Sequence, residues 1–396
     1  MTTSKSLKII IFDGSFKTTA FINRLIVGLV KSHQVYILGF NENLTAPIKG
    51  VNYVKLGSNA SKIRFIKTSL ALAFSQLSIK LLFATVLHVL KFNRTQLRNQ
   101  NFKIAVDTIN PDIIHAQWVS NIPILEPILL QNSYPVVLSQ RGFHINVRPF
   151  IATNNLNYLK QWLPKMAGFH SVSKAISLKG DLIYSHPSKI DHVVYSGLNV
   201  SQMHFKEHYK KGSKIKLISI GRAHWVKGYE YALAACSILK KQHINFSYTI
   251  VGAGQDEELI YLRQFYQLED EVIFLNSLPQ QDVFEKIKGA DVMLLPSIEE
   301  GIANVAIEAM ALGTLVISTN CGGMQELIEH EKEGWIVPTL RSASLAEAII
   351  DFNKKPDTVL DKIRYDARKK IENKFTEKNM LQGMESLYIE CLNENH

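Results

Sequence analysis

The chain has 396 residues, of which 46% are hydrophobic and 20% are charged, and this composition excludes a disordered or fibrous protein. Its three cysteines are too few and too widely spaced for a disulfide framework or a zinc knuckle, so a reducing, cytoplasmic compartment is expected. Residues 1–200 carry 22 Lys and Arg against 7 Asp and Glu, whereas the rest of the chain carries 23 against 28. The basic first half predicts an anionic partner: a membrane surface, a phosphorylated acceptor or a nucleic acid.

The first half of the chain alternates strand and helix patterns, which predicts a mostly parallel, doubly wound sheet. Its first apolar run, Leu7–Phe12, follows Met1–Ser6 directly and is too short for the core of a signal peptide, so it is expected to form the first strand. The other strands predicted here are Gln34–Phe40, Asn52–Leu56, Asp112–Ala116, Val136–Gln140, Gly168–Ser173 and His192–Ser196. The predicted helices are Thr18–Lys31, Leu97–Ile109 and Lys174–Tyr184.

One segment of the first half, Ile63–Phe92, is helical in propensity and rich in Leu and Phe. Lys67, Lys80, His88 and Lys91 interrupt it too often for a membrane span of about 20 apolar residues. Two interpretations stay open: helices buried against the amino-terminal sheet, or a basic amphipathic element in the headgroup region of a membrane.

The second half repeats the alternation, and the polar, basic stretch Lys206–Ser213 is expected to link the two halves. We therefore expect an amino-terminal domain over residues 1–205, a carboxyl-terminal domain over 206–375, and a last helix over 376–396 that packs back toward the first domain. The predicted strands are Ile215–Gly221, Ser247–Gly252, Val272–Asn276, Val292–Pro296, Leu315–Thr319 and Trp335–Pro338. The predicted helices are Gly228–Lys241, Asp256–Tyr266, Gln281–Gly289 and Leu345–Phe352, the last opened by a capping box of Ser344 and Glu347.

The stretch Pro296–Gly313 predicts a strand end, a loop and a helix in succession. Good helix formers run from about Ala303 to Leu312, and Gly313 is placed to end the helix as a C-cap. The loop Ser297–Gly301 therefore meets the open amino end of a helix, where unpaired backbone N–H groups favour an anion. The amides placed to bind that anion belong to Ile302, Ala303 and Asn304.

Two acidic and two basic side chains are expected around this loop. Glu300 lies in the loop and Glu308 about one turn inside the helix, so both carboxylates are expected to face one ligand. The alternative is a helix with one Glu near its start and the other on its solvated face. Gly221–Gly228 follows the first strand of the second half, at the strand end where open α/β sheets bind ligands. Its Arg222 and Lys227 are placed to bracket a diphosphate; the alternative is two solvated surface cations.

Several spaced motifs carry a family resemblance. In the carboxyl half they are GRAHWVKG at 221–228, VGAG at 251–254, LPQQDVFEKIKGADVMLLPSIEEGIANVAIEAMALGTLVIST at 278–319, GGMQELI at 322–328 and EGWIVP at 333–338. In the amino half PDIIHAQW at 111–118, VVLSQRGFHI at 136–145, SVSKAIS at 171–177 and VVYSGLN at 193–199 match more loosely. Together they resemble family 4 of the retaining glycosyltransferases (glycosyl transferases group 1), which implies the α/β GT-B fold: two facing Rossmann-like, doubly wound domains with an interdomain cleft.

The resemblance implies a nucleoside-diphosphate sugar donor on the carboxyl half and an acceptor on the amino half. Arg222 and Lys227 would hold the donor diphosphate and neutralise the charge that grows on it as the glycosidic bond breaks. Glu300 would bind hydroxyls of the transferred sugar and Glu308 the ribose, while the amides from Gly301 to Asn304 would complete the phosphate and sugar contacts. Retention in this family implies front-face attack, in which the leaving phosphate takes the acceptor's proton.

The amino half departs from the family pattern at two loops. Family members commonly carry a glycine pair near the donor phosphates, whereas this chain offers the single Gly14. The family's sugar contact is often a His directly before a Gly, whereas this chain has Arg141 before Gly142 and His144 two residues later. Either side chain is placed to reach the reacting centre, and Arg141 suits an acidic sugar or a phosphate; the alternative is a basic loop at the rim of the site.

The predicted function is transfer of a sugar from a nucleoside diphosphate to a lipid-linked or polysaccharide acceptor in cell-surface glycan biosynthesis. The chain has no Asp-x-Asp pair, so neither a metal nor a cofactor is expected. The resemblance further implies a retaining, hexosyltransferase-type enzyme. Its expected location is cytoplasmic, with peripheral contact to the anionic inner face of the membrane. The main alternative is a nucleotide-sugar epimerase of similar two-domain fold. A nucleic-acid binder is disfavoured, because Phe and Leu follow helical core spacing instead of alternating with Lys and Arg along a groove.

Overall fold

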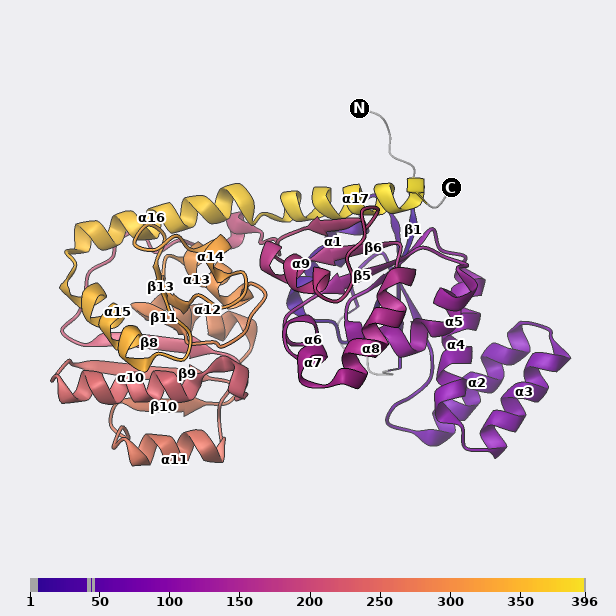
Figure 1. Cartoon of the computed structure of the whole chain (residues 1–396), viewed down its shortest axis with the longest axis horizontal. Coiled ribbons are helices and arrows are strands. Elements are labelled where there is room, and N and C mark those ends of the chain that lie inside the picture. The colour runs from indigo at the N-terminus through magenta and orange to yellow at the C-terminus, as the bar shows by residue number, and fades with distance from the viewer. Residues whose placement is uncertain (1–5, 41–43, 45–46, 395–396) are drawn as a thin grey trace. The chain divides into compact units, whose positions relative to one another are not determined.

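The computed structural model describes residues 6–40, 44 and 47–394, so residues 1–5, which entered the argument about a signal peptide, lie outside it. The chain forms two compact units, whose elements are labelled in Figure 1. Unit 1 comprises residues 1–172, 177–194 and 377–396, and unit 2 comprises residues 173–176 and 195–376. None of the helices described is at once long enough and apolar enough to cross a membrane.

Unit 1 is built on a seven-stranded parallel sheet with the order β3-β2-β1-β4-β5-β6-β7. Its strands are β1 (Lys8–Gly14), β2 (Gln34–Gly39), β3 (Val51–Lys55), β4 (Ile113–Ala116), β5 (Val136–Gln140), β6 (Gly168–Ser171) and β7 (Asp191–Val193). Every residue of β4 and β5 is buried, as expected for central strands of a parallel sheet covered on both faces. The helices of this unit are α1 (Ala20–Leu29), α2 (Lys62–Ser75), α3 (Ile79–Leu90), α4 (Arg94–Ile109), α5 (Ile122–Gln131), α6 (Phe143–Asn146), α7 (Arg148–Ile151), α8 (Thr153–Trp162), most of α9 (Lys174–Asp181) and α17 (Glu377–Glu394).

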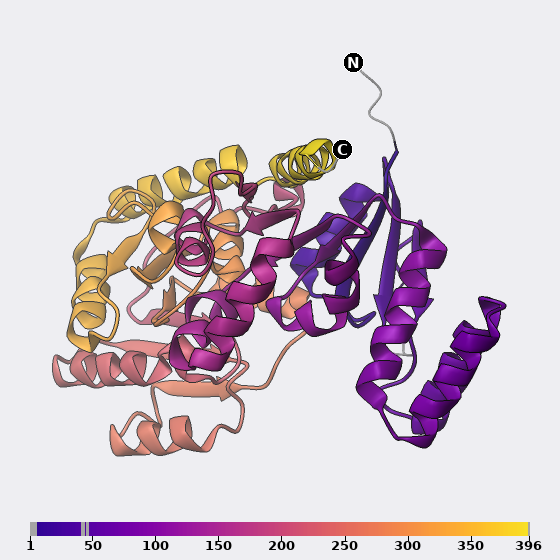
Figure 2. The same ribbon diagram turned by 45° about the vertical axis from the view of Figure 1, so that its right-hand side comes forward.

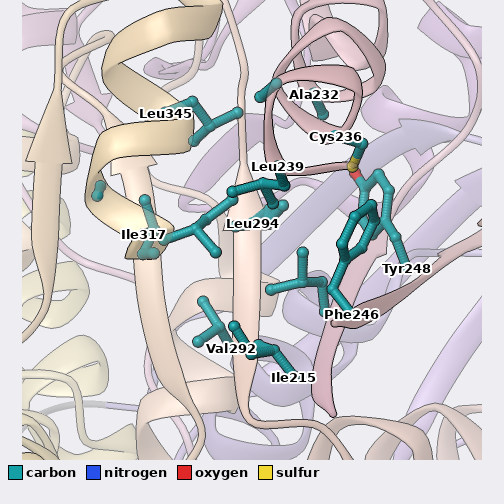
Figure 3. Close-up of a cluster of buried hydrophobic side chains, with 14 of the residues drawn as sticks. Ile215, Ala232, Cys236, Leu239, Phe246, Tyr248, Val292, Leu294, Ile317 and Leu345 are labelled. Carbon is teal, nitrogen blue, oxygen red and sulfur yellow. The ribbon is translucent and has the colours of Figure 1, made fainter. Parts of the chain in front are cut away.

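Unit 2 is built on a six-stranded parallel sheet with the order β10-β9-β8-β11-β12-β13. Its strands are β8 (Ile215–Ile220), β9 (Phe246–Val251), β10 (Val272–Leu275), β11 (Val292–Leu295), β12 (Leu315–Thr319) and β13 (Trp335–Val337). Its helices are α10 (Tyr229–Lys241), α11 (Glu257–Phe265), α12 (Gln280–Gly289), α13 (Asn304–Leu312), α14 (Met324–Leu327), α15 (Ser342–Lys354) and α16 (Asp357–Lys374). Figure 3 shows one of its two apolar cores, where Ile215, Val292 and Ile317 of the sheet meet Leu239 of α10 and Leu345 of α15.

The doubly wound architecture predicted from the sequence is confirmed, and all thirteen predicted strands are present. Gly313 ends α13 as expected: its φ is 84°, and its N–H donates to the carbonyl of Met310. The predicted capping box of Ser344 and Glu347 is wrong. Helix α15 already begins at Ser342 and its N-cap residue, Arg341, makes no side-chain cap, so Ser344 lies inside the helix.

The chain passes from unit 1 to unit 2 between Val194 and Tyr195, before the boundary expected after residue 205. The segment Leu198–Met203 belongs to unit 2 because its apolar side chains are buried in that unit's core beside Ile307 and Ile371. Arg368 of α16 fixes the same segment, since its guanidinium donates to the carbonyls of Val200 and Met203. The last helix, α17, belongs to unit 1, where it packs on α1, β6 and β7.

The segment Ile63–Phe92 forms α2 and α3, which pack on each other and on α4. Only Phe65, Ser69 and Ala73 of α2 and Thr85 of α3 are buried. Burial against the sheet therefore accounts for a small part of this segment, and most of its apolar side chains are left exposed.

The strand order of each sheet reverses once, between β1 and β4 in unit 1 and between β8 and β11 in unit 2. In open α/β sheets, ligands bind at the carboxyl ends of the strands beside such a switch point. In unit 2 the strands β8 and β11 end at Ile220 and Leu295, so the loops Gly221–Gly228 and Ser297–Gly301 both begin there. The two loops that carry the predicted donor residues therefore lie at the position where this sheet type binds its ligand.

Candidate functional site

The centre of the site in unit 2 is an ion pair between Lys227 and Glu300. The Nζ atom of Lys227 lies 2.5 Å from Oε1 of Glu300, and the hydroxyl of Ser297 donates to the same oxygen at 3.1 Å. About a fifth of each side chain is exposed, 22% for Lys227 and 17% for Glu300, so the pair is accessible to a ligand but partly shielded from bulk water. Two side chains that are 73 residues apart in the sequence thus meet at the switch point.

The loop of Lys227 is held against the loop of Glu300 by backbone contacts. A short 3-10 turn, Trp225–Lys227, ends at Gly228 with a φ of 63°, and a Cβ on Gly228 would lie 2.1 Å from the carbonyl oxygen of Pro296. The N–H of Ile298 donates to the carbonyl of Val226 at 2.8 Å. A glycine is therefore required at 228 for the two loops to approach so closely.

Two further glycines, Gly322 and Gly323, pack against the Glu300 loop. The N–H of Gly323 donates to the carbonyl of Gly301 at 2.7 Å. A Cβ on Gly322 would lie 1.8 Å from the carbonyl oxygen of Glu300, and one on Gly323 would lie 2.5 Å from that of Gly301. Because both contacts are to backbone atoms, neither glycine tolerates a side chain without displacing the loop.

The amino end of α13 follows this loop. The helix has no side-chain cap, and the N–H of Ala303 points at Sδ of Met324, 3.5 Å away. Oδ1 of Asn304 is buried and has no hydrogen-bond partner among the described residues. Glu308, one turn further on, is 6% exposed, so the solvated-face alternative is wrong for this residue. Gly301 and Ile302 directly precede this helix end. Its first backbone N–H groups are not capped by a side chain, and the side-chain oxygen of Asn304 has no partner among the described residues.

Arg222 lies in the same loop as Lys227 and is exposed. Burial, together with the nearby charges of Arg222 and Lys227, lowers the pKa of His224. His224 is therefore neutral at neutral pH, and Arg222 and Lys227 remain the cations of this loop. The arrangement is a cationic loop in contact with the loop that leads into a helix amino end, and these two features favour a di-anionic group such as a diphosphate.

Unit 1 carries a second polar cluster at its own switch point, after β1, β4 and β5. The indole N–H of Trp118 donates to the carboxylate of Asp13. The guanidinium carbon of Arg141 lies 4.6 Å from the ring centre of Phe21, and Nη2 of Arg141 donates to Oε1 of Gln117 at 3.1 Å. Among the described residues, Nε of Arg141 and Nε2 of Gln117 are buried without a hydrogen-bond partner. These unsatisfied donors indicate a place for a ligand with acceptor oxygens.

Electrostatics make Arg141 the cation of this cluster. Burial lowers the pKa of Arg141 to about 10, so it stays charged at neutral pH, and burial raises the pKa of Asp13 to about 6. A chain of hydrogen bonds runs behind Arg141 from His115 through Ser139 to His170, with 2.8 Å at each step. Burial lowers the pKa of His170 to about 3, and that of His115 well below its usual value. Both imidazoles are therefore neutral, and they orient the Ser139 hydroxyl that accepts from Arg141.

The second residue that the sequence offered beside Arg141 is His144, on α6. It lines a pocket of about 320 Å³ together with Arg148 and Tyr158. Gly14 ends β1 with a φ of 83°, next to Asp13, so a single left-handed glycine makes the turn.

The sequence argument missed Asp13, Ser297 and Gln117. Asp13 was detectable, because it directly precedes Gly14 at the end of the first strand. No local pattern distinguishes Gln117, whose role comes from its contact with Arg141, 24 residues away. Ser297 contacts Glu300, three residues further on, but no motif marked it. Within the described ranges, no group of three or more His, Cys, Asp or Glu side chains is placed to hold a metal ion.

Part of the chain matches a known protein family. Residues 200–370 match the family model of the glycosyl transferases group 1. The chain is 33% identical over 208 residues to WcaL of Salmonella typhimurium, and the match covers 51% of each chain. The name of WcaL describes it as a colanic acid biosynthesis glycosyltransferase. It is 31% identical over 198 residues to the amylovoran biosynthesis glycosyltransferase AmsK of Erwinia amylovora, over 48% of each chain. The chain thus matches about half the length of these curated relatives.

Solved structures show the same architecture over nearly the whole chain. Sucrose-phosphate synthase from Thermosynechococcus elongatus superposes with a TM-score of 0.77 over 98% of this chain and 100% of that one, at 17% identity. HepE from Anabaena, solved in complex with UDP-glucose, superposes with a TM-score of 0.71 over 96% of this chain and 99% of its own, also at 17% identity. The family-model match is confined to residues 200–370, and the two Rossmann-like units of the chain have the GT-B fold.

Proposed function

We propose that the protein is a retaining, metal-independent glycosyltransferase that moves a sugar, expected to be a hexose, from a nucleoside diphosphate to a glycan or lipid-linked acceptor in cell-surface glycan biosynthesis. The observation that carries this proposal is the Lys227–Glu300 pair at the switch point of unit 2, beside the uncapped amino end of α13. The names of WcaL and AmsK support polysaccharide biosynthesis, and the UDP-glucose complex of HepE supports a nucleotide-sugar donor.

In this proposal, Lys227 and Arg222 bind the donor diphosphate. An ammonium group has three donors, so Lys227 keeps its bond to Glu300 while it offers two more to phosphate oxygens. The two cations and the amides from Gly301 to Asn304 neutralise the charge that develops on the leaving diphosphate, which replaces the role that a divalent metal plays in other transferases. The acceptor attacks from the face that the diphosphate leaves, and the diphosphate takes its proton.

The two carboxylates act in recognition. Glu300, fixed by Lys227 and Ser297, accepts hydrogen bonds from hydroxyls of the transferred sugar. Glu308 is buried on α13 and binds the ribose. Because Glu300 is already paired with a cation, it suits hydrogen-bond acceptance better than proton transfer.

We further propose that unit 1 binds the acceptor through Arg141, with Gly14 shaping the turn beside it and His144 lining the neighbouring pocket. The unpartnered Nε of Arg141 favours an acceptor with a phosphate or carboxylate group. A lipid-linked acceptor of that kind places the enzyme in the cytoplasm, peripheral on the anionic inner face of the membrane.

The proposal is tested by incubating the full chain with radiolabelled UDP-, GDP- and ADP-sugars, with and without a lipid extract of cells that make surface polysaccharide. Transfer of label to a larger or lipid-soluble product, dependent on the extract, supports it. An epimerase instead converts the sugar in the absence of any acceptor. Conversion without acceptor, or release of no diphosphate under any condition, contradicts the proposal.

A further inference from the structure

The α2–α3 hairpin of unit 1 presents an apolar surface that the protein itself does not cover. Figures 1 and 2 show these two helices beside α4, with α3 on the side of the hairpin away from the sheet of unit 1. Of the twelve residues of α3, only Thr85 is buried. Helix α3 is therefore attached to the unit along one narrow side.

The exposed large apolar side chains of α3 form one continuous stripe. They are Ile79, Phe83, Val86, Leu87 and Leu90, with exposed fractions of 88%, 64%, 40%, 36% and 67%. Their spacing of four, three, one and three residues keeps all of them within one face of an α-helix. A folded domain normally buries such a stripe, so this face is built to contact another apolar phase.

Two further exposed apolar residues flank α3 in the sequence. Leu77 before it and Phe92 after it are 88% and 92% exposed. Both residues adopt left-handed backbone conformations, with φ of 50° and 53°, which Gly or Asn adopt with less strain. Two large apolar side chains at strained, fully solvated positions are unfavourable in water, and insertion into an apolar phase removes the cost of their exposure.

The positive charge of the hairpin and its neighbouring segments indicates which apolar phase the stripe contacts. Residues 43–106 contain ten Lys and Arg and no Asp or Glu. A second copy of the chain would bring the same positive charge to the contact, whereas the surface of an anionic bilayer has the opposite charge. The base of the hairpin also holds an apolar pocket of about 230 Å³, bordered by Lys62 and Arg94. Cations around an apolar opening complement a lipid, with its phosphate outside and its chain within.

We propose that α3 lies in the headgroup region of an anionic phospholipid bilayer, with the stripe from Ile79 to Leu90 inserted among the acyl chains. This inference deepens the proposed function: it names the surface and the lipid class through which an enzyme with a lipid-linked acceptor reaches its membrane. Binding combines apolar insertion with attraction of the surrounding Lys and Arg to lipid phosphates, so it depends on both the stripe and the lipid charge.

The test is co-sedimentation of the full chain with vesicles, in the absence of any donor. Wild-type protein is expected to bind vesicles of phosphatidylglycerol and phosphatidylcholine, and to bind pure phosphatidylcholine at least tenfold more weakly. The double variant Phe83→Asp/Leu90→Asp is expected to lose at least tenfold in binding to the anionic vesicles. The matched control is Leu178→Asp/Leu182→Asp, which adds the same charge at two unit 1 leucines that are each 66% exposed. Its binding is expected to stay within about threefold of wild type.

A second measurement reports insertion directly. The native cysteines are buried, so a thiol-reactive environment-sensitive dye labels Phe83→Cys selectively. Its emission is expected to shift to the blue on addition of anionic vesicles, whereas the dye on Leu178→Cys is not expected to shift.

The inference is overturned if Phe83→Asp/Leu90→Asp binds anionic vesicles as wild type does, or if both double variants lose binding equally. It is also overturned if the wild-type chain self-associates without vesicles and the α3 substitutions abolish only that self-association, because the stripe is then an interface between copies. Calorimetry with nucleoside diphosphates on the same variants separates this outcome from failure of the proposed function. Nucleotide binding that is absent from every variant counts against the enzyme proposal alone.

Discussion

Replacing Lys227 by Met tests the donor site through its central contact. At 2.5 Å and an effective dielectric constant of 20, the attraction between Lys227 and Glu300 is about 7 kcal/mol before the cost of desolvation. Because about four-fifths of each side chain is buried, the cost of desolvating the two charges offsets most of this attraction. We therefore expect Lys227→Met to lower the free energy of unfolding by about 1–3 kcal/mol.

The effect on ligand binding is the informative one. Loss of a charge-assisted hydrogen bond to the diphosphate is expected to weaken binding by about 1.5–3 kcal/mol, which is about 10- to 150-fold in Kd. The assay is isothermal titration calorimetry with UDP, GDP and ADP at low salt. Lys355→Met is the matched control, because Lys355 is 21% exposed and ion-paired in the same unit. Its Kd is expected to stay within about twofold of wild type. Equal affinities for wild type and Lys227→Met, or an equal loss in Lys355→Met, would refute the reasoning.

Three further predictions concern the rest of the two sites. Glu300→Gln is expected to leave the Kd of the free nucleoside diphosphate, measured by calorimetry, within about threefold of wild type. Because the carboxylate contacts the sugar, the same variant is expected to lower kcat/KM with the nucleotide sugar, measured from initial rates, by at least about 100-fold. Gly322→Ala is expected to destabilise the protein by about 2–4 kcal/mol in chemical denaturation, because its Cβ would lie 1.8 Å from the Glu300 carbonyl oxygen. The raised pKa of Asp13, about 6 in the folded protein against 3.8, means that its contribution to stability falls as pH rises between these values. Asp13→Asn is therefore expected to stabilise the protein by about 2 kcal/mol at pH 7.5 and by about half of that at pH 5, and an effect that is equal at both pH values, or is larger at pH 5, would contradict this assignment.

Local pattern was sufficient to predict the elements that carry the sites. Apolar runs such as Val136–Gln140 identified the buried parallel strands, and Gly313 was recognised as a helix end because only a residue tolerant of positive φ fits there. The switch point follows from strand order, which a sequence alone does not give. The direct contact between Lys227 and Glu300 was therefore not predicted; the sequence indicated only that both side chains bind one ligand.

Features determined by distant contacts were not predictable. Helix α16 was missed because Arg364 occupies a position on its apolar stripe; the guanidinium is buried and satisfied by the carbonyl of Gly313 at 2.6 Å. Helix α5 contains Pro127, which lowers its apparent helix propensity. The pKa of Asp13 likewise depends on the folded chain, since burial raises it while the hydrogen bond from Trp118, 105 residues away, opposes the rise.

The central claim is that one nucleoside diphosphate binds at the switch point of unit 2, between the Arg222–Lys227 loop and the amino end of α13. Its most direct test is thermal unfolding of the full chain with UDP, GDP, ADP and CMP and their sugars, compared with an Arg222→Met/Lys227→Met variant. Selective stabilisation of wild type by one nucleoside diphosphate, absent from the variant, is the predicted result. Stabilisation of the variant to the same extent as wild type, or no stabilisation by any of these ligands, would contradict the account.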